Sequence, residues 1–596
     1  MSPGFTASGE HPSMDLDAVL TRLEKLPKFR ELDDKVLRDF SKALEWLSLP
    51  GGWRLFSQGD AGDALYVVTS GRLGIIVATP GRPEELVAEI GVGETVGEMA
   101  LISGEARSGT ALAIRDTELL RLAKPVFEAF AKQHPGIMTP IMVLLAERLK
   151  RTTQHSTPMH PPRTLAIIPL DASTPCGELR IQLMEVLGTM GLRTQGLDDA
   201  AASNSAEWFQ NIETQNDLTL YQTEPSPSPW TKLCLRRADH ILLAASADGP
   251  ANALPAFQST LDGRPQRCVD VVVLESAKGS VNAGWLGSLK GHLRHSVRLG
   301  SRQDIARLAR IITNRAIGLV LSGGGARALA HLGAVRALRS AGMPFDLVGG
   351  TSMGAIIAAG IAFEWDDKEL CDRLREAFVE NNPLSDLTLP LVALFKGRTV
   401  TRLLQRHFGD IQIEELRRPY FCVSSNLTTA RAIVHRSGLL RRALRASVAI
   451  PGVLTPVVES GEVLVDGGVL NNLPVDVMRA FGRGPVVGID VAANRALVSA
   501  NINLEETSLW RLLRHNRRQV PWILSTLLRA GTVSSDVQEL AFKRQADVIL
   551  MPPLETVDLL DWKSFDRIVE VGHRYTMGML DRAGESPLRS LLVTST

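Results

Sequence analysis

The stretch that decides the fold of this chain reads FDLVGGTSMGAIIAA, residues 345–359. It opens with an apolar run that predicts a buried strand and closes with an alanine-rich run that predicts a helix. Between them lies Gly-Thr-Ser-Met-Gly, a GxSxG pattern that forms a nucleophile elbow in this context. The glycines let the neighbouring backbone pass close to a tight turn, and a helix start stabilises a developing oxyanion. The pattern therefore predicts Ser352 as a catalytic nucleophile.

A glycine-rich loop precedes this elbow in the stretch AIGLVLSGGGARALAHLGAVRAL, residues 316–338. Gly323, Gly324 and Gly325 follow a predicted strand and lead into a predicted helix, so their N–H groups can converge on one anion. We interpret this loop as an oxyanion hole. The rival interpretation, a dinucleotide or phosphate loop, needs GxGxxG with an acid downstream or a lysine after the last glycine, and neither matches well. Arg327 is expected to anchor the loop or to favour an anionic substrate.

A hydrolytic serine needs a base, and Asp466 is the best candidate. It ends the apolar run 462–465 and is followed by two glycines, and a carboxylate in a desolvated site can accept a proton from serine. Beyond Asp466 the chain has only two histidines, His515 and His573, and neither lies in an obvious strand-end loop. The sequence therefore favours a Ser–Asp dyad over a Ser–His–Asp triad.

The 596 residues are too many for one core and predict several domains. Helical spacing from Leu16 to about Leu47 predicts short helices, and short alternating runs from Trp53 onward predict a small β-roll. The continuous apolar runs TLAIIPL, DHILLAA and CVDVVVLES predict buried parallel strands. We therefore expect a multidomain chain with an N-terminal β-roll, a central α/β domain and a C-terminal α/β hydrolase with a parallel-rich sheet. The expected boundaries are a tail over 1–13, the β-roll domain over 14–150, a Pro-rich linker over 151–163, the central domain over 164–312, the hydrolase domain over 313–494 and a mostly helical extension over 495–596.

Composition and charge exclude several classes of function. Lys plus Arg number 66 and Asp plus Glu number 65, so the chain has no general attraction for nucleic acid. The five cysteines show no CxxC or Cys/His spacing, so we expect reduced thiols and no metal site. We see neither a signal peptide nor a membrane span and expect a cytoplasmic chain. The central domain lacks GxxxxGK[ST], so it is not a working P-loop and we assign it no chemistry.

The motifs GGGARALAHLG, GTSMG and DGG occur here in the order of a patatin-like phospholipase domain, which the chain resembles. The stretches RASVAIPGVLTPV (445–457) and DGGVLNNLPVDVMRAFG (466–482) are similar to the neuropathy target esterase branch of that family. The resemblance implies serine hydrolysis of acyl ester bonds in phospholipids and lysophospholipids, with no required cofactor. The family's loop usually continues Arg-Gly, whereas Ala328 follows the arginine here. A Gly-only dihedral at that position would disturb the oxyanion geometry.

Two N-terminal stretches, GDAGDALYVVTSGRLGIIV (59–77) and GETVGEMALISGEARSGTALA (93–113), resemble a cyclic nucleotide-binding domain. In such a domain an arginine pairs with the exocyclic phosphate and a carboxylate accepts the ribose 2′-OH. The resemblance implies cAMP or cGMP as a regulator. The residues that it assigns to the nucleotide site are Gly97, Glu98, Arg107 and Ser108, with Arg107 at the phosphate and Glu98 at the ribose. The alternative is a degenerate roll that binds nothing and serves for docking.

A phospholipid substrate lies in a bilayer or micelle, so we expect peripheral association with a membrane surface. The stretch 508–529 combines Trp and Leu with Arg, and it predicts either an interfacial helix or a helical hairpin packed on the catalytic domain. Two other functions stay open. A cyclic-nucleotide-responsive lipid-binding or scaffolding protein would keep the fold without turnover, and an acyltransferase would use an alcohol in place of water.

Overall fold

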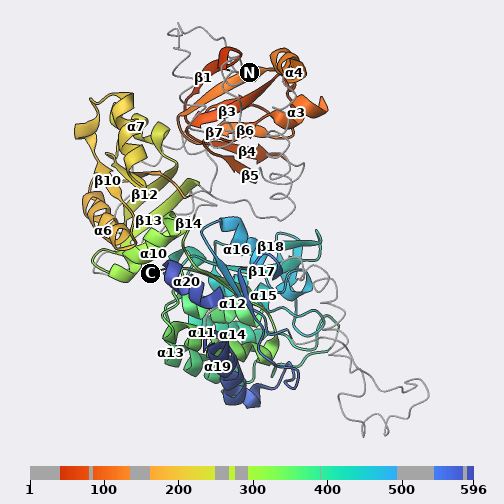
Figure 1. Ribbon diagram of the computed structural model, residues 1–596. Coiled ribbons are helices and arrows are strands. Elements are labelled where there is room, and N and C mark those ends of the chain that lie inside the picture. Colours follow the sequence, from red (N-terminus) through yellow and green to blue (C-terminus); the bar gives the residue numbers. More distant parts are fainter. Residues whose placement is uncertain are drawn as a thin grey trace. The chain divides into compact units, whose positions relative to one another are not determined.

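The computed structural model describes residues 41–78, 85–133, 161–247, 268–275, 293–389, 391–492, 543–581 and 587–595. The chain divides into two compact units, whose elements are labelled in Figure 1. The first unit comprises residues 1–172, 193–243 and 252–269, and the second comprises residues 173–192, 244–251 and 270–596. Within the described residues, no helix is both long enough and apolar enough to cross a membrane.

The N-terminal part of the first unit is a β-roll of two antiparallel four-stranded sheets, in the orders β1-β8-β3-β6 and β2-β7-β4-β5. Its elements are β1 (Glu45–Leu49), β2 (Arg54–Phe56), β3 (Ala64–Ser70), β4 (Leu73–Val77), β5 (Glu85–Ile90), β6 (Thr95–Val96), α3 (Glu98–Ser103), β7 (Thr110–Ala113), β8 (Thr117–Ala123) and α4 (Lys124–Gln133). Both sheets contribute to one core that includes Tyr66, Leu73 and Leu119, as strands with one buried face do. The expected β-roll is confirmed.

The prediction of short helices up to about Leu47 is wrong at the C-terminal end of that segment. Glu45–Leu49 is strand β1, and all five of its residues pair with β8. Pairing and packing in a sheet override a local helical pattern. Residues before 41 lie outside the described part of the chain.

The central α/β part contains a six-stranded sheet with the order β10-β11-β9-β12-β13-β14 and parallel pairing. Its elements are β9 (Thr164–Pro169), α6 (Cys176–Thr189), β10 (Thr194–Leu197), α7 (Ala206–Gln215), β11 (Leu218–Gln222), α8 (Pro229–Arg237), β12 (His240–Ser246), β13 (Val269–Glu275), β14 (Leu293–Arg298) and α10 (Arg302–Ile312). Every residue of β9 is buried, so the continuous apolar runs were correctly interpreted as strands covered on both faces.

The second unit contains the catalytic-type domain, built on a mixed eight-stranded sheet. Its order is β19-β20-β17-β16-β15-β21-β22, and β18 also pairs with β17. The strands are β15 (Gly318–Leu321), β16 (Leu347–Thr351), β17 (Tyr420–Asn426), β18 (Arg431–His435), β19 (Val457–Glu459), β20 (Glu462–Asp466), β21 (Val486–Ile489) and β22 (Val548–Leu550). Neighbours along β17-β16-β15-β21-β22 are parallel, whereas β18, β19 and β20 pair antiparallel. The parallel-rich sheet is confirmed.

Helices cover both faces of this sheet. They are α11 (Ala330–Ser340), α12 (Met353–Ala362), α13 (Asp367–Arg375), α14 (Arg398–Phe408), α15 (Leu440–Ser447), α16 (Val475–Phe481), α19 (Phe565–Asp581) and α20 (Pro587–Ser595), with a 3₁₀ helix η5 (Gly325–Leu329) before α11. The large core on one face includes residues of α11, α12, α14, α15 and α19, and a second core on the other face includes residues of α16.

The chain beyond residue 494 contributes to this domain. Strand β22 extends the sheet by pairing parallel with β21. Helix α19 packs closely on α11, because a Cβ added at Gly333 would lie 1.8 Å from the Val569 carbonyl oxygen, and one at Gly572 would lie 2.0 Å from that of Ala330. The described part of the extension is therefore an integral layer of the catalytic-type domain. The stretch 508–529 lies outside the described residues.

Candidate active site

Ser352 stands between β16 and α12, at the turn that the sequence predicts. Its φ of 55° and ψ of −125° lie outside the regions that L-residues usually occupy, as at a strained nucleophile elbow. A Cβ added at Gly350 or at Gly354 would lie 2.6 Å or 2.5 Å from the Leu321 carbonyl oxygen. Only glycine therefore fits on either side of the turn. The Ser352 N–H donates to Ser447 Oγ at 2.9 Å, which fixes the elbow against the end of α15.

The Ser352 hydroxyl donates a 2.6 Å hydrogen bond to Asp466 Oδ2. The other carboxylate oxygen of Asp466 accepts the Gly468 N–H at 2.8 Å. Ser352 is 9 % and Asp466 is 6 % exposed, so the contact lies where electrostatic interactions are stronger than in water. Within the described residues no histidine is hydrogen-bonded to Ser352. The acceptor for the serine proton in this geometry is a carboxylate.

Strand β17 brings these two residues together although they are 114 positions apart in the sequence. Strand β16 pairs with it up to Thr351, which lies opposite Val423. Strand β20 pairs with the next residues of β17, with Asp466 opposite Ser424. Because β18 covers the other edge of β17, β16 and β20 must follow one another along the same edge. Two consecutive residues of β17 thus set the end of β16, which leads into Ser352, beside the Asp466 carboxylate.

The glycine loop runs directly beside Ser352. A Cβ added at Gly323 would lie 3.0 Å from Ser352 Cβ. The Gly323 N–H already donates to the Asn472 carbonyl at 3.2 Å. The N–H groups of Gly324 and Gly325 form no hydrogen bond within the described part of the chain. These two amides, rather than all three, are the candidate oxyanion donors.

The loop is held by the segment that precedes α19. The Ala326 N–H donates to the Leu559 carbonyl at 2.8 Å, and Arg327 Nε donates to the Val557 carbonyl at 2.7 Å. Of the two roles expected for Arg327, the structure shows the anchoring one. Ala328 is buried in η5 and is not among the described non-glycine residues with positive φ. Its backbone therefore does not require glycine.

A buried histidine fixes the start of the glycine loop. His331 Nε2 lies 2.9 Å from the Ser322 carbonyl, so this ring nitrogen must carry the proton and donate it. Burial lowers the pKa of His331 to about 4. The ring is therefore neutral at neutral pH. No motif singles out His331, although its position six residues beyond the last glycine of the loop is a usable signal.

A second serine lies beside the carboxylate. Ser424 is the cross-strand partner of Asp466, and its Oγ is 2.7 Å from His435 Nε2 on β18. Ser424 is fully buried, and burial lowers the pKa of His435. The sequence analysis missed this pair because only the register of β17, β18 and β20 brings its members to the site.

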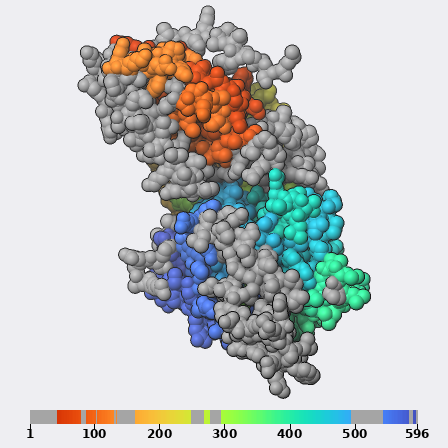
Figure 2. Space-filling view, turned by 90° about the vertical axis from the view of Figure 1, so that its right-hand side faces the viewer, coloured from red at the N-terminus to blue at the C-terminus, as the bar shows by residue number. Residues whose placement is uncertain are grey.

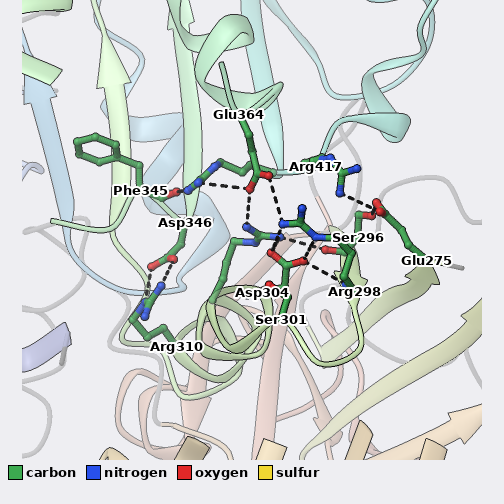
Figure 3. A network of polar contacts seen from close by, with 12 residues as sticks. Glu275, Ser296, Arg298, Ser301, Asp304, Arg310, Phe345, Asp346, Glu364 and Arg417 are labelled. Atoms are coloured by element: carbon green, nitrogen blue, oxygen red, sulfur yellow. Dashed lines mark hydrogen bonds and ion pairs between the residues drawn. The ribbon is translucent and has the colours of Figure 1, made fainter. Parts of the chain in front are cut away.

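Helix α10 is bound to both ends of the unit formed by β16, the elbow and α12. Arg310 donates two hydrogen bonds of 2.9 and 2.7 Å to Asp346, the residue before β16. Arg307 Nη1 donates to Glu364 at 3.1 Å, and Glu364 follows α12 with a φ of 66°. Figure 3 shows Asp346 and Glu364 within this network of arginines and carboxylates. Removing one partner of a buried ion pair leaves an uncompensated charge, so these contacts hold β16 and α12, on either side of Ser352, in place.

The nucleotide-site candidates lie in the β-roll, and Arg107 is at their centre. Its guanidinium donates to the carbonyls of Gly97 at 2.9 Å and Ala64 at 2.8 Å, and to Asp63 Oδ1 at 3.0 Å. It also lies 4.2 Å from the centroid of the Phe56 ring. The buried Arg107 Nε has no hydrogen-bond partner within the described residues. Both terminal nitrogens of the arginine are therefore held, and the Nε–H is unused.

The other three candidates are adjacent in the same roll. Gly97 has a φ of 93°, and a Cβ there would lie 2.3 Å from Arg107 Nη1, so this position requires glycine. Glu98 is buried at the first position of α3, whereas Ser108 is exposed. The structure thus brings Gly97, Glu98 and Arg107 together and leaves Ser108 on the surface.

Metal and disulfide chemistry find no support in the part of the chain that the structure describes. No group of three or more His, Cys, Asp or Glu side chains that could hold a metal ion occurs there. All five cysteines are free thiols.

Three protein-family models match the chain. They are "Patatin-like phospholipase" over residues 319–479, "Cyclic nucleotide-binding domain" over 46–134 and "Neuropathy Target Esterase family P-loop like domain" over 162–284. The last covers most of the central sheet, to which the sequence assigned no chemistry.

Curated relatives match along most of the chain. Patatin-like phospholipase domain-containing protein 6 of Pongo abelii is 30% identical over 95% of this chain and 46% of its own length. Neuropathy target esterase sws of Drosophila melanogaster is 29% identical over 90% and 42%, and Lysophospholipase NTE1 of Phaeosphaeria nodorum is 27% identical over 92% and 43%. The chain thus spans a little less than half the length of these relatives.

The nucleophile elbow, the glycine loop and the parallel-rich sheet define the class of patatin-like α/β folds. Within that class the chain is similar, along most of its length, to the neuropathy target esterase branch of the patatin-like phospholipases, and its N-terminal part matches the cyclic nucleotide-binding domain. Both resemblances drawn from the sequence are confirmed.

Proposed function

We propose that this chain is a serine hydrolase that cleaves acyl ester bonds of phospholipids and lysophospholipids through an acyl-enzyme on Ser352. The observation that carries the proposal is the 2.6 Å hydrogen bond from the Ser352 hydroxyl to Asp466, formed at a strained elbow. A serine hydroxyl is a weak nucleophile until an adjacent base accepts its proton, and Asp466 is the group positioned to do so.

The proposed reaction has two halves. In the first, Ser352 Oγ attacks the ester carbonyl carbon while its proton passes to Asp466, and the resulting oxyanion accepts hydrogen bonds from the Gly324 and Gly325 amides. The ester C–O bond then breaks, and Asp466 returns the proton to the departing alcohol oxygen. In the second half, water attacks the acyl-enzyme and gives a proton to Asp466. The fatty acid leaves as that proton returns to Ser352 Oγ.

A covalent serine-hydrolase probe tests the proposal directly. A fluorophosphonate should label wild-type protein at Ser352 and leave the Ser352→Ala variant unlabelled. Purified protein should also release fatty acid from lysophosphatidylcholine and phosphatidylcholine. Labelling without release of fatty acid to water would favour an acyltransferase, and absence of both would favour a non-catalytic lipid-binding or scaffolding protein.

We further propose that the β-roll binds a cyclic nucleotide, cAMP or cGMP, as a regulator. The specific support is the buried Arg107 Nε, which lacks a partner within the described residues although both terminal nitrogens of the guanidinium are bound. A single phosphate charge can use this N–H, and the buried Glu98 carboxylate next to Gly97 suits a ribose hydroxyl. Titration calorimetry with both nucleotides tests binding, and no heat change at millimolar concentration would contradict it.

A further inference from the structure

Four strongly exposed large apolar side chains gather on one loop of the catalytic-type domain. Leu387, Leu389, Leu391 and Val392 are 73%, 78%, 89% and 65% exposed, and we call these four residues the apolar tip. A single exposed leucine is ordinary on a protein surface, but neighbouring exposed apolar residues form a patch that marks an interaction site. We therefore expect the apolar tip to contact another molecule.

The apolar tip projects from an ordered base. The Thr388 N–H donates to the Leu394 carbonyl at 3.0 Å, and the Lys396 N–H donates to the Asp386 carbonyl at 3.0 Å. These bonds close an irregular hairpin, and its Phe395 packs on the large core. Backbone hydrogen bonds thus hold the base of the loop that exposes these leucines.

The hairpin is connected to the site through one backbone segment. The N–H groups of Leu394 and Phe395 donate at 2.9 Å to the carbonyls of Gly452 and Val453. A few residues earlier in that segment, the Ala449 carbonyl accepts the Asp466 N–H at 2.9 Å. Figure 2 shows green-to-cyan parts of the domain exposed on one face. The apolar tip thus belongs to the structural neighbourhood of the dyad.

Unpaired cations flank the apolar tip. Lys396 and Arg398 are exposed, and within the described residues neither side chain forms an ion pair. Arg402, one turn further along α14, is also exposed and bonds only to Thr399 among the described residues. Apolar side chains next to basic ones are the composition that binds the interface of an anionic bilayer.

We propose that the apolar tip docks the catalytic-type domain on a phospholipid bilayer, with its leucines among the acyl chains and Lys396 and Arg398 at the head groups. The inference rests on the proposed function, because a hydrolase of bilayer lipids has to reach them at the interface. It goes beyond that function by assigning the contact to a defined loop, and the stretch 508–529 is not needed for it.

The test uses the full chain and vesicles of phosphatidylcholine, alone and with added phosphatidylserine. The double variant Leu389→Asp/Leu391→Asp should partition much more weakly onto vesicles in a flotation assay. Each of the two substitutions should lower the partition coefficient by about tenfold or more, because each buried leucine contributes roughly that factor. The matched control is Ile181→Asp, which changes a 62% exposed residue of α6 and should bind as wild type. Lys396→Gln/Arg398→Gln should remove the gain in binding that phosphatidylserine provides.

Hydrolysis of a water-soluble ester separates this inference from the proposed function. Its rate should be the same in wild type and in the Leu389→Asp/Leu391→Asp variant, while hydrolysis of vesicle lipid falls. Wild-type protein that hydrolyses no ester contradicts the proposed function, but the flotation assay still tests the docking proposal. Equal flotation of wild type and the leucine variant overturns the docking proposal. So does a variant that only converts a dimer into a monomer, since the occupant is then a second copy of the chain.

Discussion

Replacing Asp466 by asparagine is the sharpest test of the proposed chemistry, because the structure dictates how the new amide is oriented. The Gly468 N–H donates to one carboxylate oxygen at 2.8 Å, so the single oxygen of an asparagine must take that position. The amide nitrogen then faces Ser352 Oγ and can only donate. The serine loses its proton acceptor although the side chain keeps its size.

The expected loss follows from general base catalysis. A positioned base contributes roughly 100- to 10,000-fold, so kcat of Asp466→Asn should fall by that factor, equivalent to about 3 to 5 kcal/mol in the transition state. The assay is hydrolysis of a soluble ester and of lysophosphatidylcholine, with thermal unfolding as a check on folding. The control is Asp476→Asn on α16, where a half-buried carboxylate accepts a 2.7 Å bond from Asn471 and has a pKa raised by desolvation. This variant should stay active.

Two outcomes would refute the reasoning. Asp466→Asn that keeps more than about a tenth of the wild-type kcat would remove Asp466 as the base, since a base contributes at least roughly 100-fold. Loss of activity in a His573 or His515 variant with unchanged folding would point instead to a histidine. The double variant with Ser352→Ala should be no worse than either single variant, because groups that act as a unit are not additive.

Three further expectations concern the loop, its anchor and the nucleotide site. Gly324→Val should fold but lose on the order of 3 kcal/mol of transition-state stabilisation, since its Cβ would lie 2.7 Å from Val491 Cγ2 and displace the amide. Unchanged kcat in Gly324→Val would give the loop another role. Ala328→Gly should change kcat little. His331 has a folded-state pKa of about 4 and an ordinary value of 6.5, so the unfolded chain binds the proton first as pH falls. The stability that the neutral ring provides above pH 6.5 should decline by about 3 kcal/mol towards pH 4, and His331→Gln should show a shallower decline in urea unfolding. Arg107→Ala should abolish nucleotide binding in calorimetry, whereas wild-type affinity would remove Arg107 from the site.

The local parts of the site could be predicted from the sequence. The elbow around Ser352 and the glycine loop at 323–325 are set by steric demands within a few residues, and such demands leave a motif. The strand that ends at Asp466 is likewise readable, because an apolar run stops at an Asp-Gly-Gly turn. These predictions concern where each residue lies in its own element, which is the information that a short pattern contains.

The remaining features depend on contacts between distant segments. The Ser424–His435 pair needs the register of three strands, and the place of strand β22 beside β21 is known only from their pairing. The bonds from α10 to Asp346 and Glu364 join residues 36 and 57 positions apart. The use of the Gly323 amide by Asn472 is of the same kind. No local pattern encodes which carbonyl lies opposite which amide. The sequence therefore predicted three candidate oxyanion donors, whereas in the structure only the amides of Gly324 and Gly325 remain candidates.

Strands β16 and β20 pair one after the other along the same edge of β17, and this has a consequence for how the protein is synthesised. Once the ribosome has synthesised the chain as far as the elbow at Ser352, the proposed base is still 114 residues away. A growing or truncated chain that lacks β20 should therefore contain a nucleophile without its proton acceptor. Pairing between distant segments is also slow to form. The proposed lipid-cleaving activity should consequently appear only once the sheet is complete.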